Sequence, residues 1–200
     1  MKMKLWSIQD PSKIDEIEST GRIICTENKY SIDWDDEYKW MVKQMVKRIG
    51  KSDIDNQYPI WAWYQHKNVN KKRPDLRRSG HLPNGIPGIR IEFEKKPKEV
   101  LLSDFVLWHF PLSYKSIIAK NETEYHKFES KLTKLKLDKT EFEDLPLNIQ
   151  LEIENSWQRI FDMKYDNKFY THSKDEKMIQ ACCWEIKREE IVKIDKFTAK

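Results

Sequence analysis

The sequence predicts an α+β fold in which a mixed, mainly antiparallel sheet forms the core and helices flank it. Residues 88–96 alternate apolar and charged side chains, as a half-buried strand does. Helical patterns at residues 10–21 and 35–50 separate the early strands. A charged stretch of helical period at about 114–164 predicts a helical insertion. Because no linker or repeat is visible, we expect one domain over residues 1–200.

The chain is expected to begin with a short strand at residues 4–9, followed by a helix. Asp10 suits the N-cap of this helix and Pro11 suits its first position. Gly21 suits the residue after its last turn, because glycine readily adopts the left-handed conformation found there. A second short strand is then expected at residues 22–26.

The segment 35–50 begins with acidic residues and ends with Lys47, Arg48 and Gly50, as the helix dipole and the C-cap favour. Its expected inner face consists of Tyr38, Met41, Val42, Met45 and Ile49. The remaining strands are expected at residues 58–65, 88–96, 178–186 and 192–197, and within residues 99–113.

The composition indicates a folded protein outside membranes. Hydrophobic residues make up 38% of the chain and charged residues 35%, and eight Trp, eight Tyr and eight Phe argue against disorder. The formal net charge is only +4, so any attraction of nucleic acid must come from a local cluster. No apolar run approaches the roughly 18 residues of a membrane span, and the N-terminus lacks the apolar core of a signal peptide. A cytoplasmic protein with no membrane partner is expected.

The cysteines and the absence of common motifs exclude several kinds of site. Cys25, Cys182 and Cys183 are too few for a disulfide framework, which favours a reducing compartment. No zinc-ligand spacing, P-loop, GxGxxG or HExxH motif occurs, and spacing gives no Ser-His-Asp triad. We therefore expect no metal cofactor.

Residues 66–81, here called the basic loop, hold the densest cluster of positive charge and only one acidic residue, Asp75. Three aromatic residues precede the loop, namely Trp61, Trp63 and Tyr64. Cations next to aromatic rings suit a phosphate-bearing ligand, either a dinucleotide or a nucleic-acid strand. The candidate nucleic-acid-binding residues are Lys71, Lys72, Arg73, Arg77, Arg78 and His81. The alternative is a solvated charged loop without a ligand.

Other polar residues have both a structural and a functional interpretation. Asp104 and His109 follow a hydrophobic run and are candidate site residues. Alternatively, Asp104 or Ser103 caps a helix and His109 is structural. Glu92 and Glu94 share one strand face, so they form a carboxylate pair in principle, although the alternation predicts that they face solvent.

Gln180 lies in an otherwise apolar strand and shares one face with Cys182, Trp184 and Ile186. A polar side chain on a buried face needs a hydrogen-bond partner. Either backbone groups satisfy this amide, or the amide contacts a ligand such as a ribose hydroxyl.

Several motifs together carry a resemblance that covers almost the whole chain. They are KLWSIQ at the start, YKWMVKQM, PIWAW with RPDLR, LLSDFVLWH, IQACCWEI and a late KF-x-AK. These motifs resemble an uncharacterised bacterial family, the domain of unknown function numbered 3841. This resemblance implies little about chemistry.

The order of parts carries a second resemblance. LWSIQ precedes a helix ending in Gly21, the aromatic YPIWAWYQ leads into an arginine-containing loop, VLLSDF runs into a Ser-Asp pair, and IQACCWEI precedes a turn and a last strand. This order resembles that of the DNA-modifying ADP-ribosyltransferase toxins. The resemblance implies an ADP-ribosyltransferase-like fold, with NAD bound as substrate between the first strand and the closing strands.

Position by position, the resemblance assigns roles to residues of this chain. Ser7 stands where the toxins have a histidine near nicotinamide, Gln9 where they have threonine, and Gln180 where they have the catalytic glutamate. The implied catalytic residues are Gln180, Arg73 and Arg77. The implied cofactor-binding residues are Trp6, Ser7, Gln9, Tyr38, Trp63 and Tyr64, with Trp61 as a further stacking candidate and Glu185 as a second candidate acid. Glutamine keeps the hydrogen bond of glutamate but lacks its charge, which predicts slower transfer.

Three hypotheses follow. The leading one is an ADP-ribosyltransferase-like protein that uses NAD to modify a nucleic acid or a protein, as a toxin or defence protein of a bacterium or phage. The second is a non-catalytic nucleic-acid-binding module in phage–host conflict, whose affinity would fall steeply with salt. The third is a protein-interaction module that uses exposed tryptophans.

Overall fold

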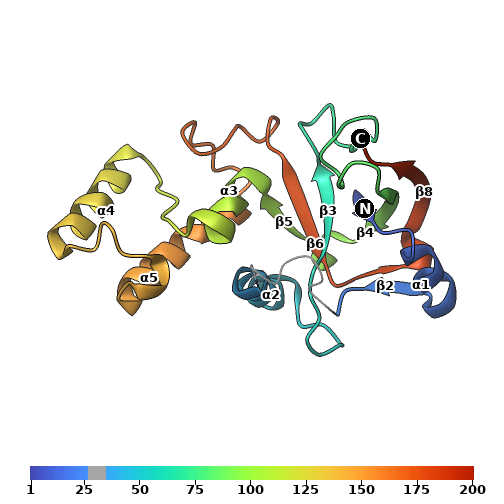
Figure 1. Cartoon of the computed structure of the whole chain (residues 1–200), viewed down its shortest axis with the longest axis horizontal. Coiled ribbons are helices and arrows are strands. Elements are labelled where there is room, and N and C mark those ends of the chain that lie inside the picture. The colour runs from blue at the N-terminus through green and yellow to red at the C-terminus, as the bar shows by residue number, and fades with distance from the viewer. Residues whose placement is uncertain (27–34) are drawn as a thin grey trace. The chain divides into compact units, whose positions relative to one another are not determined.

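The computed structural model describes residues 1–26 and 35–200 of the chain. These residues form two compact units (Figure 1). The first consists of Met1–Leu102 and Met178–Lys200, and the second of Ser103–Lys177. The second unit contains the predicted insertion and extends beyond it at both ends. One domain over residues 1–200 stays a prediction.

Among the described residues, the first unit is built on two β-sheets and two α-helices, which confirms the predicted α+β class. Its strands are β1 (Met3–Gln9), β2 (Arg22–Ile24), β3 (Ile60–Gln65), β4 (Pro87–Lys95), β6 (Ile179–Cys183), β7 (Glu185–Lys187) and β8 (Ile191–Thr198), and β5 (Leu101–Asp104) crosses into the second unit. The helices are α1 (Lys13–Thr20) and α2 (Asp35–Ile49). Single 3-10 turns lie at Pro97–Glu99 and Arg188–Glu190.

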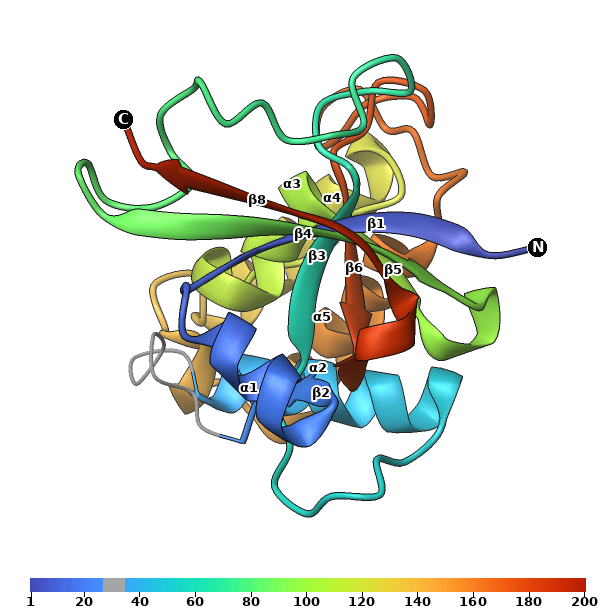
Figure 2. The same cartoon turned by 90° about the vertical axis from the view of Figure 1, so that its right-hand side faces the viewer.

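The six-stranded sheet has the order β5-β6-β3-β1-β4-β8, and β2 pairs with β7 in a separate two-stranded sheet. The pairs β1–β3, β1–β4, β3–β6 and β4–β8 are antiparallel. The strands β3 and β6 run across the direction of β1, β4 and β8 (Figure 2). The two halves meet where β1 and β3 pair at a single position, Trp6 opposite Trp63.

One side of this sheet faces the hydrophobic core of the first unit. Leu5, Ile91 and Phe93 are fully buried there and alternate with residues on the other side. The same core includes Ile17 of α1, Ile23 of β2 and Ile60, Ala62, Ile89, Val100, Ala181, Cys183 and Ile186. Burying each large apolar side chain stabilises the fold by about 1.5–3 kcal/mol. The packed core therefore holds the sheet in place, and the sheet fixes the positions of polar residues on its other side.

Several boundaries differ from the sequence prediction. The first helix begins at Lys13 rather than at Pro11, because the Asp10 carboxylate accepts from the Ser12 amide in a turn before it. The helix ends at Gly21 as predicted, with a φ of 76°. The strand predicted at 178–186 is interrupted at Trp184, so β6 and β7 belong to different sheets.

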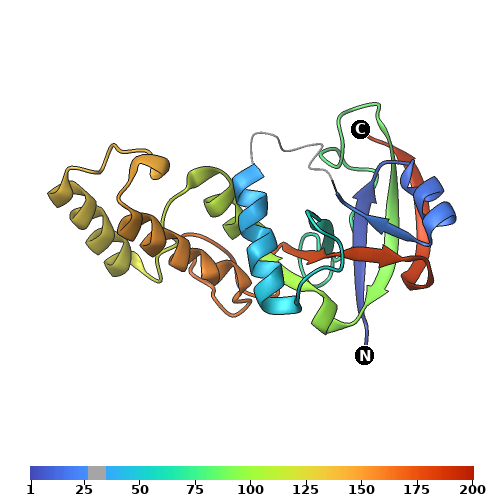
Figure 3. The same ribbon diagram turned by 90° about the horizontal axis from the view of Figure 1, so that it is seen from below.

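The strand predicted within residues 99–113 corresponds to β5, which ends at Asp104, and a helix follows. The second unit is made of that helix, α3 (Phe105–His109), with α4 (Glu122–Leu135) and α5 (Leu147–Ser156), and with short helical turns at Phe110–Tyr114, Phe142–Asp144 and Trp157–Phe161. Helices α4 and α5 lie side by side (Figure 3). An ion pair between Lys131 and Glu152 joins them. Within the described residues, no helix has the length and apolarity that crossing a membrane requires.

Candidate functional site

A row of four side chains crosses the sheet on the side away from the core. Gln180 of β6 is opposite Trp63 of β3, Trp63 is opposite Trp6 of β1, and Trp6 is opposite Glu92 of β4. Side chains of directly opposed residues stand on the same side of a sheet. The pairing therefore gathers an amide, two indoles and a carboxylate, and we call these four residues the cross-sheet row.

Gln180 ends this row with an unsatisfied acceptor. Its amide oxygen Oε1 is buried and has no hydrogen-bond partner among the described residues. Leaving a buried acceptor unpaired costs about 1–3 kcal/mol. The backbone therefore does not satisfy this oxygen, and a ligand that donates a hydrogen bond would relieve the cost.

Glu92 ends the row at the other side with a charged carboxylate. The Trp6 indole Nε1 donates to it at 2.9 Å, and Lys4 Nζ lies 2.8 Å from its other oxygen. Burial alone would raise the pKa of the Glu92 carboxyl, but the bonds from Lys4 and Trp6 and the charges of Lys4 and Arg73 outweigh it, so the pKa lies below its usual value. The prediction that Glu92 faces solvent is wrong, since Glu92 is buried.

The basic loop presents only some of its cations to solvent. Lys71, Arg73 and Arg78 are exposed. Arg77 is exposed as well, but its guanidinium makes two hydrogen bonds to the Asp75 carboxylate, at 2.9 and 2.8 Å. These bonds hold the pKa of Asp75 well below its usual range. The charge of Arg77 is thus largely matched.

Two further loop residues lie against aromatic rings. Lys72 Nζ is 5.4 Å from the centre of the Tyr64 ring. His81 lies beside His66, with 5.4 Å between ring centres, and its Nε2 is 2.9 Å from the Asp75 carbonyl oxygen. Burial, and after it the neighbouring His81, lower the pKa of His66 from 6.5 to about 4. His66 is therefore uncharged near neutral pH.

Ser7 and Gln9 do not join Gln180. On β1 they alternate with Trp6 and point to its other side. The fully buried Ser7 hydroxyl donates to the Trp61 carbonyl at 2.7 Å, and the Gln9 amide donates to Ser7 at 2.7 Å. The two residues that the resemblance pairs with Gln180 are therefore bonded to each other and to backbone.

The candidates of the second unit have structural partners. Asp104 caps α3, accepting from the amides of Val106 at 2.9 Å and Leu107 at 3.2 Å. Its second oxygen is 2.6 Å from Lys177 Nζ, and both side chains are fully buried. His109 Nδ1 is 3.0 Å from the Phe105 carbonyl oxygen. This arrangement matches the capping alternative and gives no sign of a catalytic pair.

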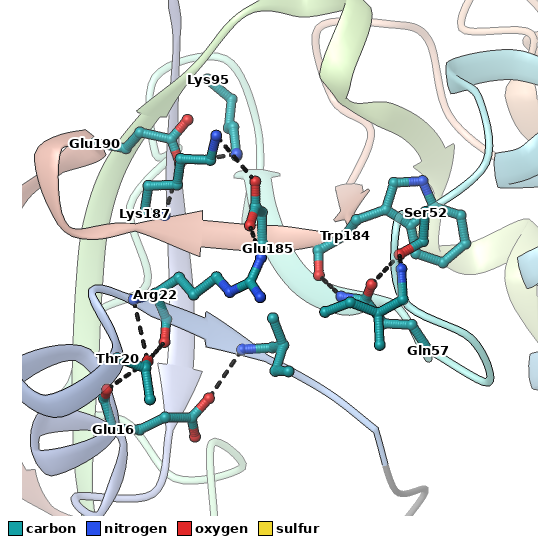
Figure 4. Close-up of polar contacts among 12 residues, drawn as sticks. Glu16, Thr20, Arg22, Ser52, Gln57, Lys95, Trp184, Glu185, Lys187 and Glu190 are labelled. Carbon is teal, nitrogen blue, oxygen red and sulfur yellow. Dashed lines mark hydrogen bonds and ion pairs between the residues drawn. The ribbon is translucent and has the colours of Figure 1, made fainter.

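Glu185 lies in β7 instead of continuing the Gln180 strand. Its carboxylate pairs with Arg22 of β2 at 3.5 Å and with Lys187 at 3.2 Å (Figure 4). The Gln57 amide donates to the carbonyl of the neighbouring Trp184, where the strand is interrupted (Figure 4). Glu185 therefore has a structural role in joining β2 and β7.

The remaining candidate side chains are an aromatic residue of α2, two buried cysteines and the tryptophans. Tyr38 packs edge to face against Trp61, with ring centres 5.8 Å apart. Burial raises the pKa of the Cys183 thiol to about 12 and that of Cys182 well above its usual value, so neither thiol suits nucleophilic attack. Of the seven tryptophans within the described residues, four are buried and three are half-buried, and the protein-interaction hypothesis stays a prediction.

Sequence reasoning missed the partners Lys4, Arg90 and Lys177. Lys4 pairs with Glu92, and Arg90 holds the basic loop through the Pro74 carbonyl. A usable signal was present: four of the nine residues of β4 are charged, namely Arg90, Glu92, Glu94 and Lys95. The charged side of such a strand either faces solvent or is covered by another segment. The basic loop is long enough to cover it.

Comparison with known proteins gives one result for most of the chain. The sequence model of a family described as "Domain of unknown function (DUF3841)" matches residues 4–192. The chain belongs to this family. All four residues of the cross-sheet row lie inside the region matched to DUF3841, whereas β8 continues beyond it. No curated protein and no solved structure matches the chain, so the resemblance to ADP-ribosyltransferases stays a prediction.

Proposed function

We propose that this DUF3841 protein is an ADP-ribosyltransferase-like protein that binds NAD along the cross-sheet row. It would use NAD to modify a nucleic acid, or a protein, that the basic loop attracts. The observation that carries the proposal is the buried, unpartnered Oε1 of Gln180 beside Trp63. An amide oxygen accepts a hydrogen bond from a ribose hydroxyl, and an indole stacks on an aromatic ring such as nicotinamide.

The charges near the row support a dinucleotide as well. Arg73 is exposed, and its charge lowers the pKa of Glu92 at the far end of the row. A guanidinium suits the diphosphate of NAD because it presents several donors in one plane. The row thus offers an acceptor for ribose and aromatic surface for a base, and Arg73 of the basic loop offers a cation for phosphate.

The proposed reaction breaks the bond between ribose C1′ and the nicotinamide nitrogen. Nicotinamide leaves with the electron pair, and a nucleophile of the acceptor bonds to C1′ and loses a proton. Positive charge develops on the ribose in the transition state, which a carboxylate at position 180 would stabilise. Because glutamine carries no charge, we expect transfer to be slower by about 10²–10³-fold than with glutamate.

Calorimetric titration of NAD tests the proposal. The wild-type protein is expected to bind NAD, and Gln180→Ala to weaken binding about tenfold, as for one lost hydrogen bond in a buried site. Gln44→Ala is a matched control, because Gln44 of α2 also has a buried amide oxygen without a partner among the described residues. No heat of binding with the wild-type protein would refute the proposal.

A second function, nucleic-acid binding without catalysis, is favoured by the exposed cations Lys71, Arg73 and Arg78. It needs no ligand at Gln180. The double variant Arg73→Ala/Arg78→Ala should weaken oligonucleotide binding and reduce its salt dependence, since each phosphate contact contributes to the salt slope. Arg77→Ala should have a smaller effect because Arg77 is paired with Asp75. An unchanged oligonucleotide affinity and salt dependence of the double variant would count against this function.

A further inference from the structure

A buried arginine holds the middle of the basic loop. Arg90 of β4 is 5% exposed. One guanidinium nitrogen donates to the Pro74 carbonyl at 2.5 Å, and the other lies 2.5 Å from the Asp195 carboxylate of β8. Pro74 directly follows Arg73 in the chain. The arginine thus connects the loop backbone next to Arg73 with the last strand of the sheet.

The end of the chain makes further contacts with the loop and the segment after it. The Phe197 ring lies edge to face on His81, with ring centres 6.2 Å apart. The Gly85 amide donates to the Ala199 carbonyl at 3.0 Å, and the Ala199 amide donates to the Ile86 carbonyl at 2.9 Å. These contacts hold the C-terminal side of the loop, whereas Arg90 holds its centre.

We propose that Arg90 is a positioning residue for the basic loop, and that Asp195 orients Arg90 for this task. The planar guanidinium reaches two acceptors in different directions at once, which a lysine ammonium on a flexible stem does not reproduce. Without this bond the loop would gain conformational freedom, and Arg73 would no longer be held near Glu92. The consequence for ligand binding rests on the proposed function, whereas the ordering of the loop does not.

Hydrogen exchange measured by mass spectrometry on the full chain tests the ordering. Arg90→Lys keeps a charge for Asp195, and Arg90→Met removes both interactions. Both variants should raise exchange of residues 66–81 by about tenfold or more and leave β1 and β3 unchanged. Lys193→Gln is the control: Lys193 is 2.6 Å from the same Asp195 carboxylate, but its side chain is 58% exposed and is expected to leave loop exchange as in the wild type.

The outcomes separate positioning from general stability. Unchanged loop exchange in Arg90→Met would overturn the inference, and so would an equal rise in the loop and in the strands. NAD titration of Arg90→Lys is the second readout, and its affinity should fall as far as that of Arg73→Gln. If the wild-type protein binds NAD and Arg90→Lys binds it equally well, the positioning role is refuted. If the wild-type protein binds no NAD, the proposed function fails and the exchange experiment still decides the inference.

Discussion

Replacing Lys177 by methionine should strongly destabilise the second unit. Lys177 and Asp104 are fully buried, with 2.6 Å between Nζ and the carboxylate oxygen. Removing one partner of a buried pair leaves an uncompensated charge and costs about 3–5 kcal/mol. Asp104 would keep the hydrogen bonds from Thr171, Val106 and Leu107, which places the expected loss near the lower end, at about 3 kcal/mol.

Urea unfolding combined with hydrogen exchange measures this loss. The free energy of unfolding should fall by about 3 kcal/mol, and exchange of the Val106 and Leu107 amides, which the Asp104 cap protects, should rise about 10²-fold. Lys127→Met is the control, because Lys127 of α4 is exposed and its replacement should change stability by less than about 0.5 kcal/mol. A loss below about 1 kcal/mol for Lys177→Met would show that Lys177 and Asp104 do not form a tightly coupled pair shielded from water.

Two further variants and one titration test the site and strand β4. The pKa of Glu92 in the folded protein lies below the ordinary glutamate value of 4.5, so its charge stabilises the fold near neutral pH and this contribution is lost as the pH falls below 4.5. Glu92→Gln should therefore lower the free energy of unfolding near neutral pH and make it fall less steeply on acidification. Urea unfolding near neutral pH and below pH 4.5 checks both effects. His66 should titrate by NMR with a pKa of about 4, so a value near 6.5 would contradict its burial. Gly88→Ala should cost about 1–3 kcal/mol in urea unfolding, because a Cβ there would lie 2.5 Å from Leu82 Cδ1 and 2.8 Å from the Phe197 ring. An unchanged stability would show that both side chains move aside freely.

Local pattern predicted the elements of the first unit well. The alternation in residues 88–96 corresponds to β4, and the acidic start and basic end of 35–50 correspond to α2. The interruption at Trp184 was not predictable from local pattern; there the Trp184 carbonyl accepts from Gln57, which is distant in sequence. A run of apolar residues carries no information about such a bond.

The sequence predicted several residues of the candidate site but not which of them lie together. Trp6, Trp63 and Gln180 were all candidates, and the strand order places them in one row. Ser7 and Gln9 were grouped with Gln180 by resemblance alone, and the alternation along β1 separates them. Glu92 was expected to face solvent because a two-residue period does not show whether a loop covers the polar side of a strand.

The sequence also did not predict which arginine of the basic loop pairs with Asp75. Arg77 and Arg78 are adjacent and equivalent by charge, yet Arg77 has the closer contacts with Asp75, at 2.8 Å against 4.0 Å for Arg78. That difference depends on the backbone turn after Asp75, in which its carboxylate accepts from the Arg77 amide. Charge counting therefore overstates the unmatched positive charge that Arg77 contributes to the loop.

A crystal structure of the protein soaked with NAD is the most direct test of the proposed site. We expect a ribose hydroxyl within about 3.2 Å of Gln180 Oε1 and the nicotinamide ring in contact with Trp63. Density for NAD bonded instead to Ser7 and Gln9, or absent at saturating concentration, would contradict it.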